Sequence, residues 1–140
     1  MNRIQIEVLP YDEENVLDLI ISASSFAFSG MVEIFTTHQE LTEFGKQLSS
    51  FPSDRNHKVS FEYGNNSGGW ASHLVLQAAV IERSTLFAIH VRMQSFASSI
   101  ENAVAEFLIP ADPAAINKLG HAIVRLVRYP NEPLVWQPKA

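Results

Sequence analysis

The stretch HLVLQAAVIERSTLFAIHVRMQ, residues 73–94, decides the fold, because it contains two alternating runs joined by a short polar turn. Such alternation is the period of a half-buried strand, and the connection 82–85 has a suitable length for a hairpin. If the turn centres on Arg83 and Ser84, apolar residues of the two strands oppose each other in pairs. The expected pairs are Leu74 with Met93, Leu76 with Val91, Ala78 with Ile89, and Val80 with Phe87. One face of the hairpin is therefore apolar, and the other is mixed.

Similar alternating or β-rich runs on both sides of this hairpin predict further strands. The expected strands are residues 3–9, 16–23, 31–36, 58–63, 70–81, 86–94 and 102–109. The glycine-rich run 64–69 is expected to be a flexible connection between two of them, since neither the lysine nor the helix of a phosphate-binding loop accompanies it.

Two helices are expected, each after a group of strands. Thr37 and Glu40 have the spacing of a capping box, and Pro52 marks the end of this first helix. Asp112 followed by Pro113 combines a good N-cap with the residue best suited to the first helical position. The order βββ-α-ββββ-α predicts an α+β domain, in which an antiparallel sheet of about seven strands packs two helices on one face.

The buried stripes of the two expected helices match at a constant offset of 75 residues. A glycine inside a helix costs about 1 kcal/mol relative to alanine, so glycines at equivalent positions predict a close contact between the helices. An internal pseudo-repeat and a coincidence between two amphipathic helices both remain open. The matching residues are Leu41, Phe44, Gly45 and Leu48 in the first helix and Ile116, Leu119, Gly120 and Ile123 in the second.

The composition predicts one domain over residues 1–140, with an extended C-terminal tail at 129–140. With 140 residues, 46% of them apolar, the chain can bury a core without staples. It contains no cysteine, which excludes disulfides and thiolate sites and favours a reducing cytoplasm. No secretory signal is expected at its start, and no apolar run approaches the roughly 20 residues of a membrane span.

The charge is uneven, because residues 1–50 contain eight acidic and two basic side chains within a chain of net charge −5. Sequence-independent binding to nucleic acid depends on many contacts from Lys and Arg to phosphate, so we expect no nucleic-acid partner. The acidic residues are candidates for contact with a basic protein, and a merely solubilising role is the competing interpretation. The residues of this candidate acidic partner surface are Asp12, Glu13, Glu14 and Asp18.

The mixed face of the central hairpin, with the strand that follows it, carries a second candidate site. A polar set on rigid strands can bind a small molecule or a partner, although antiparallel sheets commonly leave one face to water. Arg92 and Glu106 are also expected to be able to form a simple ion pair. The residues of this polar sheet face are His73, Gln77, His90, Arg92 and Glu106.

Metal and cofactor sites are not expected. In the predicted register His73 and His90 are four residues apart along the strands, roughly 13 Å, which is too far for one ion. A basic stripe on the second helix could bind phosphate, but it lacks an aromatic residue for stacking on bases, and a solvated helix face is the simpler interpretation. The stripe consists of Lys118, His121, Arg125 and Arg128.

Four short stretches resemble those of small uncharacterised bacterial single-domain proteins, some of which are similar to immunity proteins of toxin systems. The resemblance implies a domain that binds another protein, and the acidic first half would suit a basic toxin. The stretches are Phe28-Ser29-Gly30, Leu41 to Gly45, Phe51-Pro52 and Phe61-Glu62-Tyr63-Gly64.

Because no catalytic constellation accompanies these features, we predict a non-enzymatic, protein-binding domain. Two alternatives stay open. One is a small-ligand-binding domain or an enzyme that uses the polar sheet face. The other is a homo-oligomer that buries this face against itself.

Overall fold

The computed structural model describes residues 1–65, 71–96 and 102–138. It confirms the α+β class and the order βββ-α-ββββ-α, with one more short strand in the C-terminal tail. Within the described residues the strands form two four-stranded antiparallel sheets, ordered β3-β2-β1-β8 and β4-β5-β6-β7. Trp70 and most of the glycine-rich connection predicted at 64–69 lie outside the described residues.

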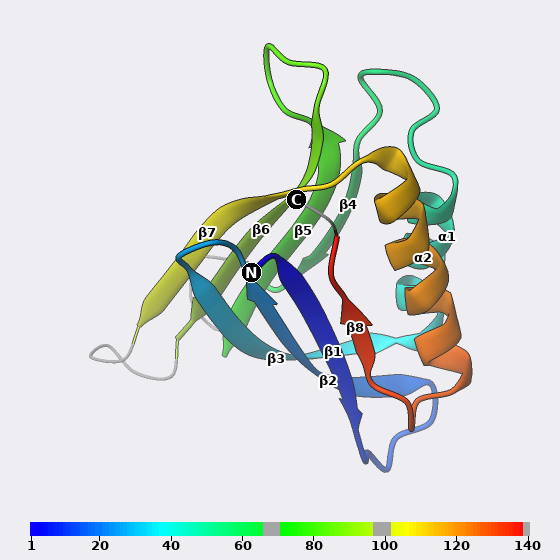
Figure 1. Cartoon of the computed structure of the whole chain (residues 1–140). Coiled ribbons are helices and arrows are strands. Elements are labelled where there is room, and N and C mark those ends of the chain that lie inside the picture. Colours follow the sequence, from blue (N-terminus) through cyan, green and yellow to red (C-terminus); the bar gives the residue numbers. More distant parts are fainter. Residues whose placement is uncertain (66–70, 97–101, 139–140) are drawn as a thin grey trace.

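The elements have the following bounds (Figure 1). The first sheet contains β1 (Arg3–Leu9), β2 (Val16–Ser24), β3 (Ser29–Thr37) and β8 (Leu134–Trp136). The second sheet contains β4 (Val59–Tyr63), β5 (Ser72–Val80), β6 (Phe87–Ser95) and β7 (Ala103–Pro110). The helices are α1 (His38–Ser49) and α2 (Pro113–Arg128). Within the described residues, neither helix is both long and apolar enough to cross a membrane.

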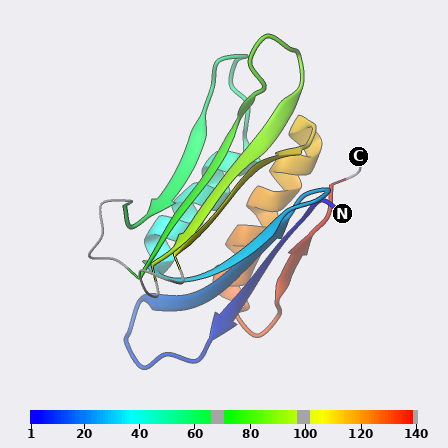
Figure 2. The ribbon, with the colours of Figure 1, turned by 90° about the vertical axis from the view of Figure 1, so that its left-hand side faces the viewer.

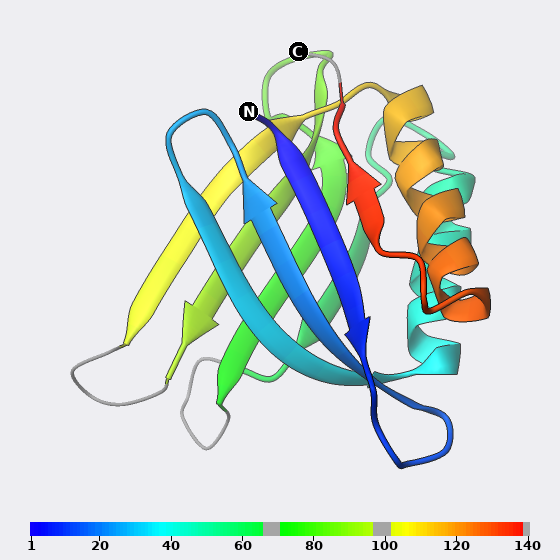
Figure 3. The same cartoon turned by 60° about the horizontal axis from the view of Figure 1, so that its bottom comes forward.

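The two sheets cross each other, and both helices lie together on one side of them (Figures 2 and 3). Strand β3 runs over the second sheet and contacts β4, β5, β6 and β7, while α1 and α2 pack mainly on each other. Apolar side chains from the two sheets and both helices form one core between these layers. Each sheet therefore has an inner face in the core and an outer face that no helix covers.

The predicted hairpin is confirmed residue by residue in β5 and β6. Leu74 opposes Met93, Leu76 opposes Val91, Ala78 opposes Ile89, and Val80 opposes Phe87. In the turn, Arg83 adopts a positive φ of 62°, and the amide of Ser84 donates to the carbonyl of Ile81 at 3.1 Å. The apolar face packs into the core, as the alternation predicted.

Both predicted helix starts are confirmed by their caps. The side chain of Thr37 accepts from the amide of Glu40 at 3.0 Å, and that of Asp112 accepts from the amide of Ala115 at 2.8 Å. At the other end of α1, the side-chain amide of Asn117 donates to the carbonyls of Leu48 and Phe51. This residue on α2 therefore binds two carbonyls at and just after the C-terminal end of α1 and ties the two helices together.

The two helices meet at the predicted glycines. A Cβ atom on Gly45 would lie 2.9 Å from the carbonyl oxygen of Gly120, and one on Gly120 would lie 2.5 Å from the carbonyl oxygen of Gly45. Backbone therefore faces backbone at this contact, and only glycine leaves enough room on either side.

The match between the two halves of the chain extends beyond the helices into the strands that follow them. Val59 and Phe61 in β4 correspond, at the same offset of 75 residues, to Leu134 and Trp136 in β8, and all four are buried. Strand β4 follows α1 but pairs with β5 of the second sheet, whereas β8 follows α2 but pairs with β1 of the first. Each half thus contributes an edge strand to the sheet of the other half.

Candidate functional site

The polar sheet face is assembled as predicted, on the outer face of the second sheet. His73 and Gln77 come from β5, His90 and Arg92 from β6, and Glu106 from β7. Register places Gln77 beside His90 and Arg92 beside Glu106. These five side chains therefore share one face of the sheet, with the edge strand β4 on one side and β7 on the other, although His73 is only 5% exposed.

Hydrogen bonds between neighbouring strands satisfy most of this polar sheet face internally. The Nε2 atom of His73 lies 2.7 Å from a carboxylate oxygen of Glu62, and Arg92 lies 2.9 Å from the Nδ1 atom of His73. His90 contacts Glu106 at 2.7 Å, and Gln77 donates to the hydroxyl of Ser60. Because its cations already face protein acceptors, this surface offers little unpaired positive charge to a ligand.

The expected ion pair between Arg92 and Glu106 is not formed. Although the two residues are neighbours in the register, the guanidinium of Arg92 contacts His73 and Gln94, and Glu106 contacts His90 instead. The ring of His90 thus takes the place that Arg92 was expected to fill. Within the described residues, no group of three His, Cys, Asp or Glu side chains could hold a metal ion.

The candidate acidic partner surface is divided between two environments. Asp12, Glu13 and Glu14 are exposed in the β1–β2 turn, whereas Asp18 on β2 is only 8% exposed. Asp18 lies between Leu9 and Phe35 in the sheet, and its Oδ1 atom has no hydrogen-bond partner in the described structure. Only the three turn residues are available to a partner.

Glu33 on β3 shares a hydrogen bond with the Asp18 carboxyl, and this contact raises the pKa of Glu33 above its ordinary value. Desolvation and the negative charge of Asp18 act in the same direction. The Glu33 carboxyl therefore holds its proton more tightly in the folded protein than an isolated carboxyl would.

The raised pKa of Glu33 predicts that acidification stabilises the fold. A carboxyl whose pKa is higher when folded adds stability that is complete below its ordinary pKa and is lost as the pH rises through its folded pKa. We therefore expect the melting temperature of the native chain to gain more between pH 7.5 and pH 5 than that of a Glu33→Gln variant. Glu7→Gln, an exposed substitution on the same sheet face, is the matched control. Equal gains in native protein and Glu33→Gln would contradict the raised pKa of Glu33.

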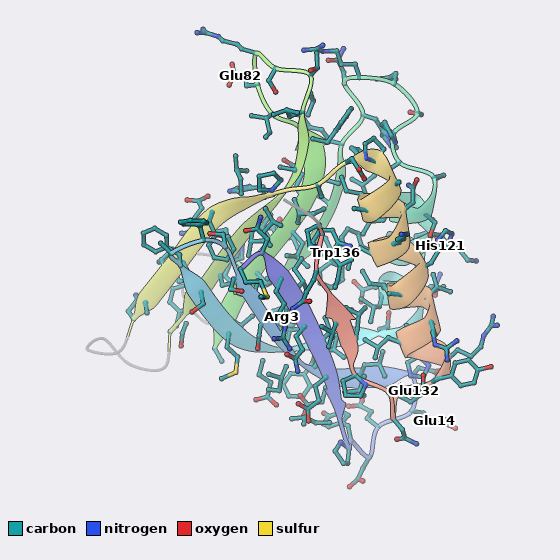
Figure 4. The ribbon with its side chains drawn as sticks, viewed as in Figure 1. Arg3, Glu14, Glu82, His121, Glu132 and Trp136 are labelled. Carbon is teal, nitrogen blue, oxygen red and sulfur yellow. The ribbon has the colours of Figure 1, made fainter. Side chains whose placement is uncertain are left out.

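A different arrangement is found on the outer face of the first sheet. At the end nearest the β2–β3 hairpin, a shallow hollow of about 430 Å³ is lined by side chains of β1, β2 and β3. Arg3 opposes Ser24, which opposes Ser29, and Gln5 opposes Ser22, which opposes Met31. Figure 4 shows Arg3 on β1, beside the strand that carries Trp136. The hollow is therefore polar across its floor and has a methionine at its edge.

The cation of this hollow is not neutralised by the protein. Arg3 donates from Nη2 to the Oε1 atom of Gln5 at 2.7 Å, and its Nε atom is buried without a partner in the described residues. In the ranges that the structure describes, Arg3 forms no ion pair with a carboxylate. The hollow therefore combines a free positive charge with neutral polar groups.

Exposed aromatic side chains stand beside the hollow, at the tip of the β2–β3 hairpin. Phe26 is 96% exposed and Phe28 is 66% exposed, and the turn is closed by a hydrogen bond from the amide of Ser25 to the carbonyl of Phe28. Met31, also 66% exposed, follows on β3. We name Phe26, Phe28 and Met31 the apolar rim. Leaving such side chains in water is costly, and an exposed group of them marks a binding surface.

The basic stripe of α2 is exposed, as predicted, but part of it is engaged. Arg125 forms an ion pair with Glu132 at 3.0 Å and lies over the ring of Tyr129 at 5.2 Å. Lys118, His121 and Arg128 lie on the solvent side of the helix, and Figure 4 shows His121 pointing away from the sheets. The stripe and the hollow are thus on different surfaces.

Comparison with known proteins gives a likeness in structure. No family model and no curated protein matches the chain, so the resemblance to immunity proteins stays a prediction. The structure of the plant transcriptional regulator PBF-2 is similar over 92% of this chain and 77% of its own, with a TM-score of 0.50 and 12% identity. The structure of WHY1 from Arabidopsis thaliana is similar over 92% of this chain and 85% of its own, with a TM-score of 0.50 and 14% identity.

This likeness contradicts our predictions of function and partners. A similar fold is found in a transcriptional regulator. This finding contradicts the predicted protein-binding domain, together with its small-ligand and homo-oligomer alternatives. It also contradicts the prediction that nucleic acid is not a partner. The exclusion was wrong because net charge averages over the whole chain, whereas a binding surface has its own local charge. Phe26 and Phe28 were not among the predicted site residues. They stand in the stretch Ser24–Gly30, where aromatic side chains among small residues indicate an exposed turn.

Proposed function

We propose that this domain binds single-stranded nucleic acid on the outer face of the first sheet. The observation that carries the proposal is the apolar rim of Phe26, Phe28 and Met31 beside the unpaired guanidinium of Arg3. The likeness in fold to a transcriptional regulator supports the same class of ligand. We also propose a cytoplasmic location, which the absence of cysteine favours.

Single strands suit this surface better than a duplex. Aromatic side chains bind unpaired bases by stacking, whereas the bases of a duplex are already stacked on each other. Reading the major groove usually requires a helix or a two-stranded ribbon that enters it. In this fold the buried residues of α1 and α2 face the core, so neither helix projects as a free reading element.

The charge of the chain is compatible with this mode of binding. Stacking contributes about 1–3 kcal/mol per base and requires no positive charge. Each neutralised phosphate contributes a slope of about −0.7 to a plot of log affinity against log salt concentration for single strands. Because Arg3 is the cation of the hollow, we expect the affinity to be modest and only weakly dependent on salt.

Removing the two phenylalanines tests the proposal. We expect a Phe26→Ala/Phe28→Ala variant to bind a fluorescent single-stranded oligonucleotide at least about fivefold more weakly than the native chain, from the loss of stacking of one or more bases. Fluorescence anisotropy with single-stranded and duplex forms of one sequence measures both affinities. The native chain should prefer the single strand.

Leu86→Ala is the matched control, since Leu86 is 63% exposed near the turn of the β5–β6 hairpin, away from the hollow. Figure 4 shows that hairpin tip, with Glu82, at the end of the molecule opposite Glu14 and Glu132. Equal losses in both variants would mean that general surface apolarity, not the rim, causes binding. No binding of any single strand by the native chain would overturn the proposed function.

A further inference from the structure

The hollow on the first sheet carries fixed hydrogen-bond donors that the protein does not use. The Oε1 atom of Gln5 accepts from Arg3, which turns its side-chain nitrogen away as a free donor. Among the described residues this nitrogen contacts no acceptor, and neither do the hydroxyls of Ser22 and Ser29. The guanidinium of Arg3 also keeps N–H groups free at Nη1, since its one side-chain hydrogen bond starts from Nη2.

Fixed donors that meet the Hoogsteen edge of a base distinguish the four bases on that edge. Guanine offers two adjacent acceptors, O6 and N7, on its Hoogsteen edge, whereas thymine offers only O4. Adenine places a donor, its N6 amino group, next to N7, and cytosine presents the N4 amino group. An amino group of a base that faced the donors of Arg3 and Gln5 would be left without an acceptor, which is costly in a partly buried site.

We propose that the hollow recognises guanine, with Arg3 and Gln5 donating to O6 and N7 while the base rests against the apolar rim. The inference rests on the proposed function, since it names the base that the single strand places in the hollow. A volume of about 430 Å³ is at the lower end of the range of ligand pockets, which suits one base better than a larger group. The 2.7 Å hydrogen bond between Arg3 and Gln5 holds the two donors in one orientation before the base arrives.

Arg3 is suited to this role by its geometry as well as its charge. A guanidinium donates two hydrogen bonds in a fixed plane, and pairing with O6 and N7 of guanine is the commonest specific contact that arginine makes with a base. A phosphate group would also accept from Arg3, but it would do so at any position of any sequence. Base identity therefore separates the two kinds of contact.

The test uses nine-nucleotide single strands of adenines and cytosines with one variable central base. We expect the strand with a central guanine to bind about fivefold or more tightly than those with central adenine or cytosine, and central thymine to lie between them. Replacing the guanine by 7-deazaguanine, which lacks the N7 acceptor, should remove much of the preference. Inosine, which keeps O6 and N7, should retain it.

Two variants locate the preference in the hollow. Arg3→Lys keeps the positive charge but loses the planar fork, and Gln5→Leu removes the amide donor, so both should reduce the ratio of affinities for guanine over cytosine. Arg128→Lys, on the exposed face of α2, is the matched control and should leave that ratio as it is in the native chain. Melting curves confirm that each variant is folded.

The outcomes separate the two proposals. Equal affinity for all four central bases, with binding still weakened by Phe26→Ala/Phe28→Ala, would overturn guanine recognition and leave nucleic-acid binding in place. A guanine preference that survives 7-deazaguanine or both variants of the hollow would also overturn it. Failure to bind any of the strands would overturn both.

Discussion

Replacing Gly120 by alanine is expected to destabilise the domain by about 2–3 kcal/mol, although alanine is the better helix former by about 1 kcal/mol. The added Cβ would lie 2.5 Å from both the carbonyl oxygen of Gly45 and the amide nitrogen of Ser49. Both atoms belong to the backbone of α1, so no side chain can rotate away. The helices must separate, and contacts of their buried stripes weaken with them.

Denaturant unfolding measures this loss, and His121→Ala is the matched control because it changes an exposed position of the same helix. The control should remain within about 0.5 kcal/mol of the native stability. If Gly120→Ala were as stable as the control, the backbone contact between the helices would be less close than the structure has it.

Truncating Trp136 to alanine is expected to cost about 3–5 kcal/mol, a large part of the stability of an ordinary domain. The indole is buried in the core, and its Nε1 atom donates to the carbonyl of Ala115 at 2.8 Å. Its backbone pairs with Ile4 of β1. Truncation therefore leaves a cavity, removes a hydrogen bond to α2 and loosens an edge strand at one position.

Two substitutions separate these contributions. Trp136→Phe keeps most of the apolar volume but loses the hydrogen bond, so it should cost less than alanine does. Val135→Ala changes the exposed neighbour in β8 and should have a small effect. Hydrogen exchange should show that amides of β1 lose protection in Trp136→Ala. Unchanged protection of β1 would mean that β8 does not hold this edge.

The elements that sequence alone could predict are those set by local periodicity. Alternation fixed the register of β5 and β6, and the caps at Thr37 and Asp112 located both helices. The glycine contact followed from the cost of glycine inside a helix. What could not be predicted is the division into two sheets, because local alternation does not show which strands pair across the helices, such as β8 with β1.

The candidate sites were predicted less completely. Periodicity brought His73, Gln77, His90 and Arg92 to one face, but it could not show which acceptor each side chain would choose. For Asp18, the charge suggested exposure, whereas its place between two apolar neighbours in the sheet buries it. Phe26 is the opposite case, since its side chain is apolar and yet exposed, because a hairpin tip offers no core to enter.

The reciprocal exchange of β4 and β8 has a consequence for how the chain is made. During synthesis, β1 leaves the ribosome long before its partner β8, which is completed only at residue 136. Until then, the edge of β1 is open, and such edges invite pairing with other chains. Contacts over so long a separation also form slowly. Before β8 has been made, the open edge of β1 is therefore the place where pairing with another chain would occur.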